Sequence, residues 1–214
     1  MPTSTLSGVV WIGGTPCAGK STIATMLARK YGLETYDLDR QYIHDERFRT
    51  GPRVTWWAAH TMDERWLDPT PEKLLERTVA SWEERLALAL APIGAARRSR
   101  GPLIVEGPGA FPWLVAPVLS DKRDAVFLIA EMAFRDRVVA DREARGASPV
   151  AYARTSDPDR ARANHRERDR RLAARIEGSC VELGLRAVSV RDGHDVERVF
   201  AEVEAQFAHR LPAL

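Results

Sequence analysis

The stretch Gly14-Thr15-Pro16-Cys17-Ala18-Gly19-Lys20-Ser21 decides how this chain is expected to fold. It follows an apolar run over residues 9–12 and leads into a helical pattern that begins near Lys20. A glycine, four residues and then Gly-Lys-Ser, set between a strand and a helix, form a phosphate-binding loop, because inward-turned backbone N–H groups and the helix N-terminus favour an anion. The sequence therefore predicts that this turn holds the phosphates of a nucleotide.

Each residue of the loop has an expected task. The two glycines allow a close backbone approach, the lysine brings a compact positive charge to the outer phosphates, and the Ser21 hydroxyl ligates a Mg²⁺ that bridges them. Two interpretations of Cys17, in the same turn, are open: the field of the helix N-terminus lowers the pKa of its thiol, or, as the preferred one, it is a small residue that lines the nucleotide. The expected nucleotide-binding residues are Gly14, Thr15, Ala18, Gly19, Lys20, Ser21 and Thr22.

Four further short apolar runs alternate with helical patterns along the chain. With residues 9–12 they make five expected strands, which predict an α/β fold in which helices cover both faces of a parallel sheet. Ligands in such sheets bind at the carboxyl ends of the strands. The further runs are residues 33–38, 103–105, 125–129 and 187–190.

Composition narrows the class of protein. The 214 residues suit one domain, and 32 basic against 30 acidic side chains leave a net charge of +2, which speaks against a nucleic-acid partner. Two cysteines do not build a disulfide framework and fit a reducing cytoplasm. No 18 apolar residues run together and no signal sequence opens the chain, so no membrane span is expected.

Residues 41–100 separate the second and third expected strands. Thr70 can cap a helix in which Pro71 takes the first position. A core stripe at helical spacing then consists of Leu75, Val79, Trp82 and Leu86. Residues 51–57, which contain Trp56 and Trp57, suggest an irregular loop.

Residues 135–175 contain twelve arginines and seven acidic residues. The scarcity of apolar residues predicts an exposed segment, within which Asp157-Pro158 starts a helix. Arg162, Arg166 and Arg170 would share one face of that helix. The segment is either a solvated surface of Arg/Asp pairs or a functional lid.

Two carboxylates, Asp37 and Asp39, end the second expected strand. The alternation of side chains along a strand would turn both to the same side, near the phosphate loop. The alternative is that one of them caps a helix that begins at Arg40.

The phosphate loop followed by Asp37-Leu38-Asp39 resembles the adenylate-kinase-like group of P-loop kinases, in particular shikimate and gluconate kinases. The resemblance implies a three-layer P-loop NTPase fold with a five-stranded sheet of order 2-3-1-4-5. It also implies ATP and Mg²⁺ as cofactors, an acceptor-binding insertion at about residues 41–100 and an Arg-rich lid at about residues 135–170.

The same resemblance implies roles for single residues. Asp37 would belong to the metal shell, and Asp39 would bind and deprotonate an acceptor hydroxyl, with Glu106 as its competitor for the base. Among the lid arginines Arg137 is preferred and Arg142 is next, with Arg166 and Arg168 as alternatives. Residues 192–194 resemble a turn near adenine, although a plain turn before a helix explains them equally well.

Together these features predict a kinase that transfers the γ-phosphoryl group of ATP to a hydroxyl of a metabolite, nucleoside or antibiotic. The expected catalytic residues are Lys20, Asp39, Glu106 and Arg137. Two alternatives stay open: a nucleoside monophosphate kinase that uses Arg47 or Arg53, and an ATP-dependent switch whose Arg-rich segment docks a macromolecule. The acceptor and the oligomeric state cannot be predicted from the residues.

Overall fold

The fold was analysed in a computed structural model that describes residues 6–44, 46–49, 51–96, 101–146, 151–193 and 195–213. Five parallel strands form one sheet in the order β2-β3-β1-β4-β5. The predicted α/β fold class and strand order are therefore confirmed. The strands are β1 (Val9–Gly14), β2 (Thr35–Asp37), β3 (Leu103–Glu106), β4 (Ala125–Ala130) and β5 (Arg186–Val190).

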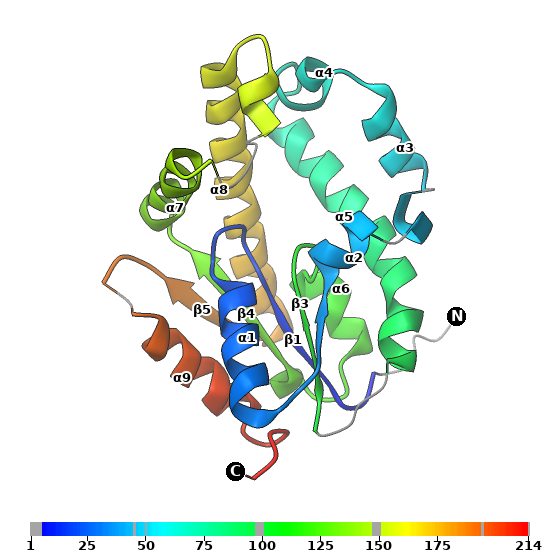
Figure 1. The fold of residues 1–214 in the computed structure, drawn as a ribbon, viewed down its shortest axis with the longest axis vertical. Helices are drawn as coiled ribbons and strands as arrows, with labels where there is room; N and C mark the ends of the chain where they lie inside the picture. Colours follow the sequence, from blue (N-terminus) through cyan, green and yellow to red (C-terminus); the bar gives the residue numbers. More distant parts are fainter. Residues whose placement is uncertain are drawn as a thin grey trace.

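Helices cover both faces of the sheet, because the strands are apolar on both sides (Figure 1). On one face Val10 and Ile12 of β1 pack with α1 (Lys20–Tyr31) and α9 (Val196–Phe207). On the other face Val9 and Trp11 join a second cluster, to which α2 (Leu38–His44) and three later helices contribute. These are α5 (Pro71–Ala95), α6 (Pro112–Val115) and α8 (Pro158–Leu183).

The chain between β2 and β3 is a set of helices. It contains α2 (Leu38–His44), a 3-10 turn η1 (Glu46–Arg49), α3 (Pro52–Ala59), α4 (Met62–Trp66) and α5. The irregular loop expected at residues 51–57 was wrong, because Pro52 takes the first position of α3 and presets its backbone for a helix. The helix expected after Thr70 is confirmed: its hydroxyl accepts a hydrogen bond from the Lys73 N–H at 3.3 Å.

α8 begins at Pro158 as predicted, and the Asp157 side chain caps it by accepting from the Arg160 N–H at 3.1 Å. The expectation of an exposed helix was wrong. Its inner face is buried, with Leu172 and Ile176 in the core beside the sheet. The helix can be buried despite its charge because its outer face holds most of its arginines, as described below for Arg166 and Arg170.

The remaining elements connect the sheet to these helices. They are η2 (Ala116–Val118), η3 (Lys122–Asp124), α7 (Met132–Ala144) and η4 (Ala151–Arg154). The start of α8 lies beside α4 at the top of Figure 1. Here Leu67, Tyr152 and Ala161 form a small buried cluster of their own. The Ser156 N–H also donates to Asp63 Oδ1 at 2.8 Å. We call the buried cluster and this hydrogen bond together the rim contact.

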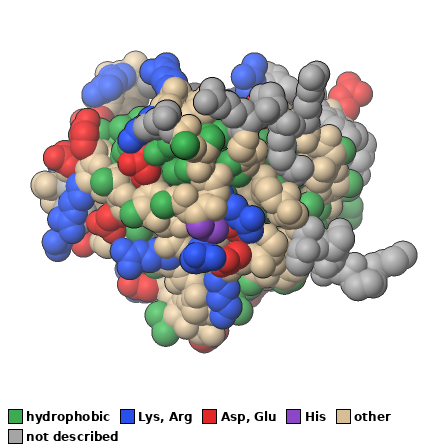
Figure 2. All heavy atoms as spheres, turned by 90° about the horizontal axis from the view of Figure 1, so that it is seen from below, with side chains coloured by type: hydrophobic (Ala, Val, Ile, Leu, Met, Phe, Trp, Pro, Cys, Tyr) green, Lys and Arg blue, Asp and Glu red, His purple; other side chains and the backbone are tan. Residues whose placement is uncertain are grey.

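The surface carries mixed charge. The face seen in Figure 2 shows Lys and Arg side chains interspersed with Asp and Glu. The described side chains of this face therefore form no extended patch of one sign that would attract a polyanion. Within the described ranges, none of the helices combines the length and the apolar composition needed to span a membrane.

Candidate active site

The phosphate loop joins β1 to α1 at the carboxyl edge of the sheet. Gly19 has φ 78°, a left-handed conformation that favours glycine, and α1 starts directly after it. Gly14 has φ 122° for a different reason: a Cβ there would lie 2.0 Å from the Leu128 carbonyl oxygen of β4. One glycine thus shapes the anion-binding turn, and the other lets the loop leave the sheet between β1 and β4.

Thr15 directs its N–H and its hydroxyl oxygen to β4, which gives no support to its expected contact with a nucleotide. It is buried, its N–H donates to the Leu128 carbonyl at 2.9 Å, and its hydroxyl accepts from the Ala130 N–H at 2.9 Å. Both polar groups therefore anchor the loop to β4. Sequence spacing alone does not reveal this, because the partners come from a strand more than 100 residues away.

Lys20 lies folded over the loop. Its Nζ donates to the Thr15 carbonyl oxygen at 2.6 Å. Burial lowers the pKa of Lys20, and the nearby Glu106 carboxylate opposes that shift. The lysine is thus a partly desolvated cation held at the turn, where an anion would compensate the cost of its charge.

Glu106 ends β3 beside the loop. It is 3 % exposed, and its Oε2 accepts a hydrogen bond from the Ser21 hydroxyl at 3.0 Å. Burial raises the pKa of Glu106, and the bond from Ser21 opposes the shift. Together the two side chains offer hydroxyl and carboxylate oxygens, the ligand type that Mg²⁺ prefers.

Asp37 and Asp39 were predicted to lie on one strand, but the structure places them in different elements. β2 ends at Asp37 and α2 begins at Leu38, so Asp39 lies in the first turn of a helix. Asp37 Oδ1 accepts from the Arg40 N–H at 3.0 Å, which is the capping role weighed as the alternative. Asp39 instead lines the cavity at the loop. Burial raises the pKa of Asp39, and the Asp37 carboxylate raises it further.

One cavity of about 290 Å³ is lined by the loop and by Asp39 and Glu106. Residues of α5, α7 and α8 complete its wall. α5 contributes Thr78 and Trp82 to its wall, and the chain after β3 adds apolar groups. Arg142 comes from α7 and Arg168 from α8. The lining residues are Gly14, Pro16, Cys17, Lys20, Ser21, Asp39, Thr78, Trp82, Glu106, Gly107, Pro108, Phe111, Arg142, Arg168 and Leu172.

The preferred arginine, Arg137, is not among the described residues that line this cavity. It pairs with Asp192 beyond β5, lies over the Phe134 ring at 5.1 Å, and is half exposed. Arg142, which is five residues further along α7, lines the cavity instead, as does Arg168 of α8. The sequence alone did not show which arginines line the cavity, because this depends on how α7 packs beside α8.

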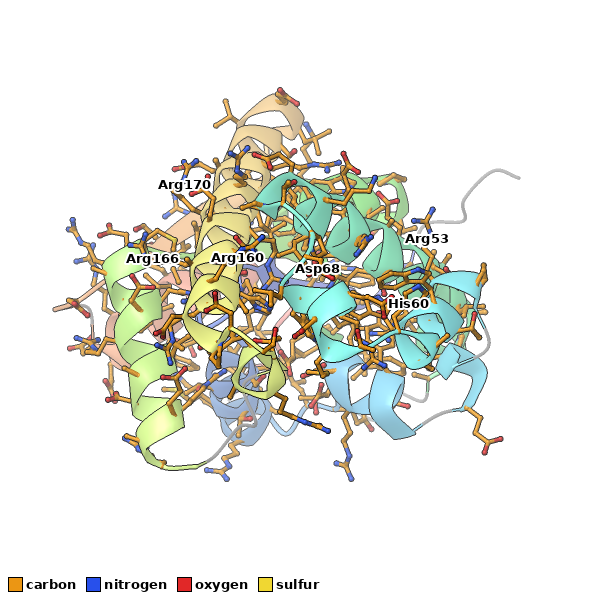
Figure 3. All side chains as sticks on the ribbon, turned by 90° about the horizontal axis from the view of Figure 1, so that it is seen from above. Arg53, His60, Asp68, Arg160, Arg166 and Arg170 are labelled. Carbon is orange, nitrogen blue, oxygen red and sulfur yellow. The ribbon has the colours of Figure 1, made fainter. Side chains whose placement is uncertain are left out.

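The other candidate arginines are engaged on the outside of α8 (Figure 3). Arg166 donates to Asp136 Oδ2 of α7 at 2.7 Å, and Arg170 donates to both carboxylate oxygens of Glu167. These contacts match the solvated Arg/Asp surface that was one of the two readings of this segment. The same helix therefore has a paired outer face and, through Arg168, a cation at the cavity.

Cys17 lines the cavity, and the alternative of a lowered thiol pKa is not supported. Burial raises the pKa of its thiol above the ordinary value, and this effect outweighs the lowering by Arg142 and Arg135. Cys17 also has φ 63°, which is unusual for a residue with a side chain. The cysteine is a neutral part of the cavity wall.

A second cavity of about 330 Å³ adjoins the outer side of the loop. Ala18, Gly19 and Thr22 form its wall at the loop, so these three predicted residues lie together. Phe134 and Val190 line it further out. Asp195, the residue after the suggested turn at residues 192–194, also lines this cavity, whereas His194 lies outside the described residues.

Sequence reasoning missed Thr78, Trp82 and Phe111 as parts of the site. Trp82 had been assigned to the core stripe of α5, and it does pack there as well. The spacing of four residues between Thr78 and Trp82 sets both on one helix face, which is the signal that was present. The sequence does not show that this face points toward the site, because its direction depends on the packing of α5 against α8.

Comparisons with known proteins give distant structural likeness. No family model matches the chain, and no curated protein matches it. A shikimate kinase from Acinetobacter baumannii, in complex with shikimate, is 16% identical with a TM-score of 0.48, covering 94% of this chain and 93% of its own. A gluconokinase from Sinorhizobium meliloti 1021 is 18% identical with a TM-score of 0.41, covering 96% and 94%. Likeness at this level does not decide function, so the site geometry must do so.

Proposed function

We propose that the protein is an ATP-dependent kinase that transfers the γ-phosphoryl group to a hydroxyl of a small molecule. The observation that supports this most is the shared cavity, in which Lys20 and Ser21 of the phosphate loop lie with Asp39, Glu106 and two arginines. Phosphoryl transfer requires an anchored nucleotide, an oriented acceptor and cations around the transferred group. The lining of this one cavity offers a candidate for each.

The roles follow from the contacts. Lys20 would bind the outer phosphates, and Ser21 with Glu106 would hold Mg²⁺, which neutralises phosphate charge when bound. Asp39 would accept the proton of the acceptor hydroxyl, since Glu106 is already engaged by Ser21. Arg142 and Arg168 would bind the transferred phosphoryl group. The base of ATP would occupy the second cavity beside Gly19 and Thr22.

Size and lining favour a small acceptor over a macromolecule. The volume of about 290 Å³ must also admit the terminal phosphate, and Trp82 with Phe111 closes one side with apolar surface. A switch protein needs no such second compartment beside its phosphate loop. The site therefore supports a kinase more strongly than a nucleotide-dependent docking protein.

The monophosphate kinase alternative receives no support from its expected arginines. Arg53 lines a different cavity with Trp56, Trp57 and Arg77, and its backbone N–H donates to Glu84 at 3.3 Å. Figure 3 shows Arg53 on the far side of the molecule from the arginines of α8. The side chain of Arg47 is outside the described residues.

A coupled assay of ADP release over a panel of hydroxylated metabolites, nucleosides and antibiotics tests the proposal. We expect at least one acceptor to stimulate ADP release and to yield a phosphorylated product by mass spectrometry. A folded protein that binds MgATP in calorimetry but leaves every acceptor unmodified would contradict the kinase assignment.

Replacement of Glu106 by glutamine is expected to raise the Mg²⁺ concentration needed for half-maximal turnover by about 10-fold, because the amide removes the negative charge beside Ser21. A Mg²⁺ titration of ADP release measures this. Glu131→Gln is the matched control, since Glu131 follows β4 at the same sheet edge but lines another cavity. A lower rate with unchanged Mg²⁺ dependence would instead make Glu106 the base.

Among the arginines of α7, the change Arg142→Ala is expected to lower kcat about 100-fold, whereas Arg137→Ala lowers it less than about 3-fold. The reason is that Arg142 lines the cavity and Arg137 pairs with Asp192 outside it. Steady-state kinetics of the two variants with one acceptor checks the order. The reverse order would restore Arg137 as the arginine at the transferred group.

A further inference from the structure

A buried cluster of charges lies behind the cavity, where α7, α8 and α5 meet. At its centre Asp169 is 4% exposed, and Arg135 of α7 is 6% exposed. Arg168, the neighbour of Asp169, reaches from this cluster to the cavity wall. None of these contacts belongs to the phosphate loop or to the carboxylates already described.

Asp169 uses its two oxygens for two different arginines. Oδ2 accepts from Arg135 Nε at 2.9 Å and from Arg135 Nη2 at 2.7 Å. Oδ1 lies 2.7 Å from Arg168 Nη2 in an ion pair, although no donor among the described residues meets it with hydrogen-bond geometry. Arg135 is further paired with Asp136 at 3.1 Å. The carboxylate thus links an arginine that is hydrogen-bonded to two carboxylates to one that faces the cavity.

Arg168 has a second tether and unused donors. Its Nη1 donates to the Thr78 hydroxyl of α5 at 3.2 Å, while its Nε has no hydrogen-bond partner among the described residues. A guanidinium carries five N–H donors, so two tethers leave donors for a ligand. Its side chain is only 12% exposed, so few rotamers are open to it.

Within this cluster of described residues, Arg168 has fewer charged partners than Arg135. Two guanidinium groups face one carboxylate, and Arg135 has Asp136 as an additional partner. His165, one turn before Arg168, adds no positive charge at neutral pH, because burial and then the two arginines lower its pKa to about 3. A buried cation of this kind is stabilised by an anion brought into the cavity.

We infer that Asp169 is a positioning residue: with Thr78 it fixes the guanidinium of Arg168 at the cavity so that the arginine meets the transferred phosphoryl group without rearrangement. The inference rests on the proposed kinase function. It adds that α5, α7 and α8 must pack in this arrangement for Arg168 to point toward the cavity. Arg135 then acts on Arg168 only through Asp169.

The test compares binding of MgADP alone with binding of MgADP and aluminium fluoride, a mimic of the phosphoryl group in transfer, by calorimetry. Wild-type protein is expected to bind the mimic complex more tightly than MgADP. Asp169→Asn is expected to keep the MgADP affinity within about 2-fold but to lose at least about 10-fold of the gain from aluminium fluoride. Asp159→Asn, the same change at an exposed residue of α8, is expected to keep the gain.

Loss of Asp169 leaves two buried arginines short of a partner and threatens the fold. Thr78→Val therefore provides a second variant, which removes the other tether without a change of charge. It is expected to lose about 3-fold of the same gain. If both variants keep the full gain, or if the wild-type protein shows none, the inference is overturned.

Chemical rescue separates positioning from a merely structural role. Guanidinium ions added to Arg168→Ala are expected to restore part of its ADP release, because Asp169 and Thr78 still form a seat for the ion. The double variant Arg168→Ala/Asp169→Asn is expected to show no rescue. Equal rescue in both would overturn the inference even if the chain is a kinase, whereas the absence of ADP release from wild-type protein with every acceptor would overturn the kinase proposal itself.

Discussion

Lys20→Met is expected to lower ADP release by at least about 100-fold while the protein stays folded. The lysine is the charge closest to the turn that would hold the outer phosphates, and methionine keeps most of its volume. Because burial lowers the pKa of Lys20, the folded chain opposes this charge when no anion is present. Its removal is therefore expected to leave the melting temperature of the nucleotide-free protein unchanged or slightly higher.

Assays of ADP release check the expected loss of activity, and thermal unfolding of the same preparation checks the expected melting temperature. Lys30→Met is the matched control in the same helix: Lys30 is exposed and pairs with Glu204 at 2.7 Å, away from the cavity. Full activity in Lys20→Met would remove the basis for the phosphate-loop assignment. A collapse of the fold would show that the lysine is structural.

Asp39→Asn is expected to lower kcat by about 10²- to 10⁴-fold with little change in MgATP affinity, because an amide cannot take the proton of the acceptor. Asp39 is the carboxylate of the cavity with no described hydrogen-bond donor on it, whereas Glu106 accepts from Ser21. Steady-state kinetics with a responding acceptor measures the loss. A normal rate would transfer the role of base to Glu106.

The pH profile gives an independent check on the same residue. A base must be ionised to act, and burial together with Asp37 raises the pKa of Asp39 above 3.8. The acid limb of kcat/KM is therefore expected above that value. Asp37→Asn removes the repelling charge, so the limb is expected to move to lower pH. A limb that stays in place in Asp37→Asn would contradict Asp39 as the titrating base.

Local patterns predicted the parts of the site that depend on neighbours in the sequence. The phosphate loop and Glu106 at the end of an apolar run lie as expected. The strand order followed from the resemblance, which rested on the same short motifs. These features are recoverable because a turn, a strand end and a cap are each determined within a few residues.

Other parts lie elsewhere than the sequence suggested, because tertiary contacts determine their positions. Thr15 was assigned to the nucleotide, but the partners of its polar groups come from β4. Arg137 and Arg142 lie on one helix, and only the crossing of α7 with α8 decides which of them meets the cavity. Asp39 was expected on a strand, and the early start of α2 moved it. A single sequence contains no direct signal for any of these three.

The rim contact has a consequence for how such an enzyme can change its specificity. Leu67 belongs to the part of the chain expected to recognise the acceptor, and Tyr152 belongs to the part that carries the arginines, yet the two share one buried cluster. Replacement of the recognition segment by that of another protein would expose Tyr152 and remove the partner of Ser156. Residues 151–164 would have to be exchanged with it, so the two segments are constrained to diverge together.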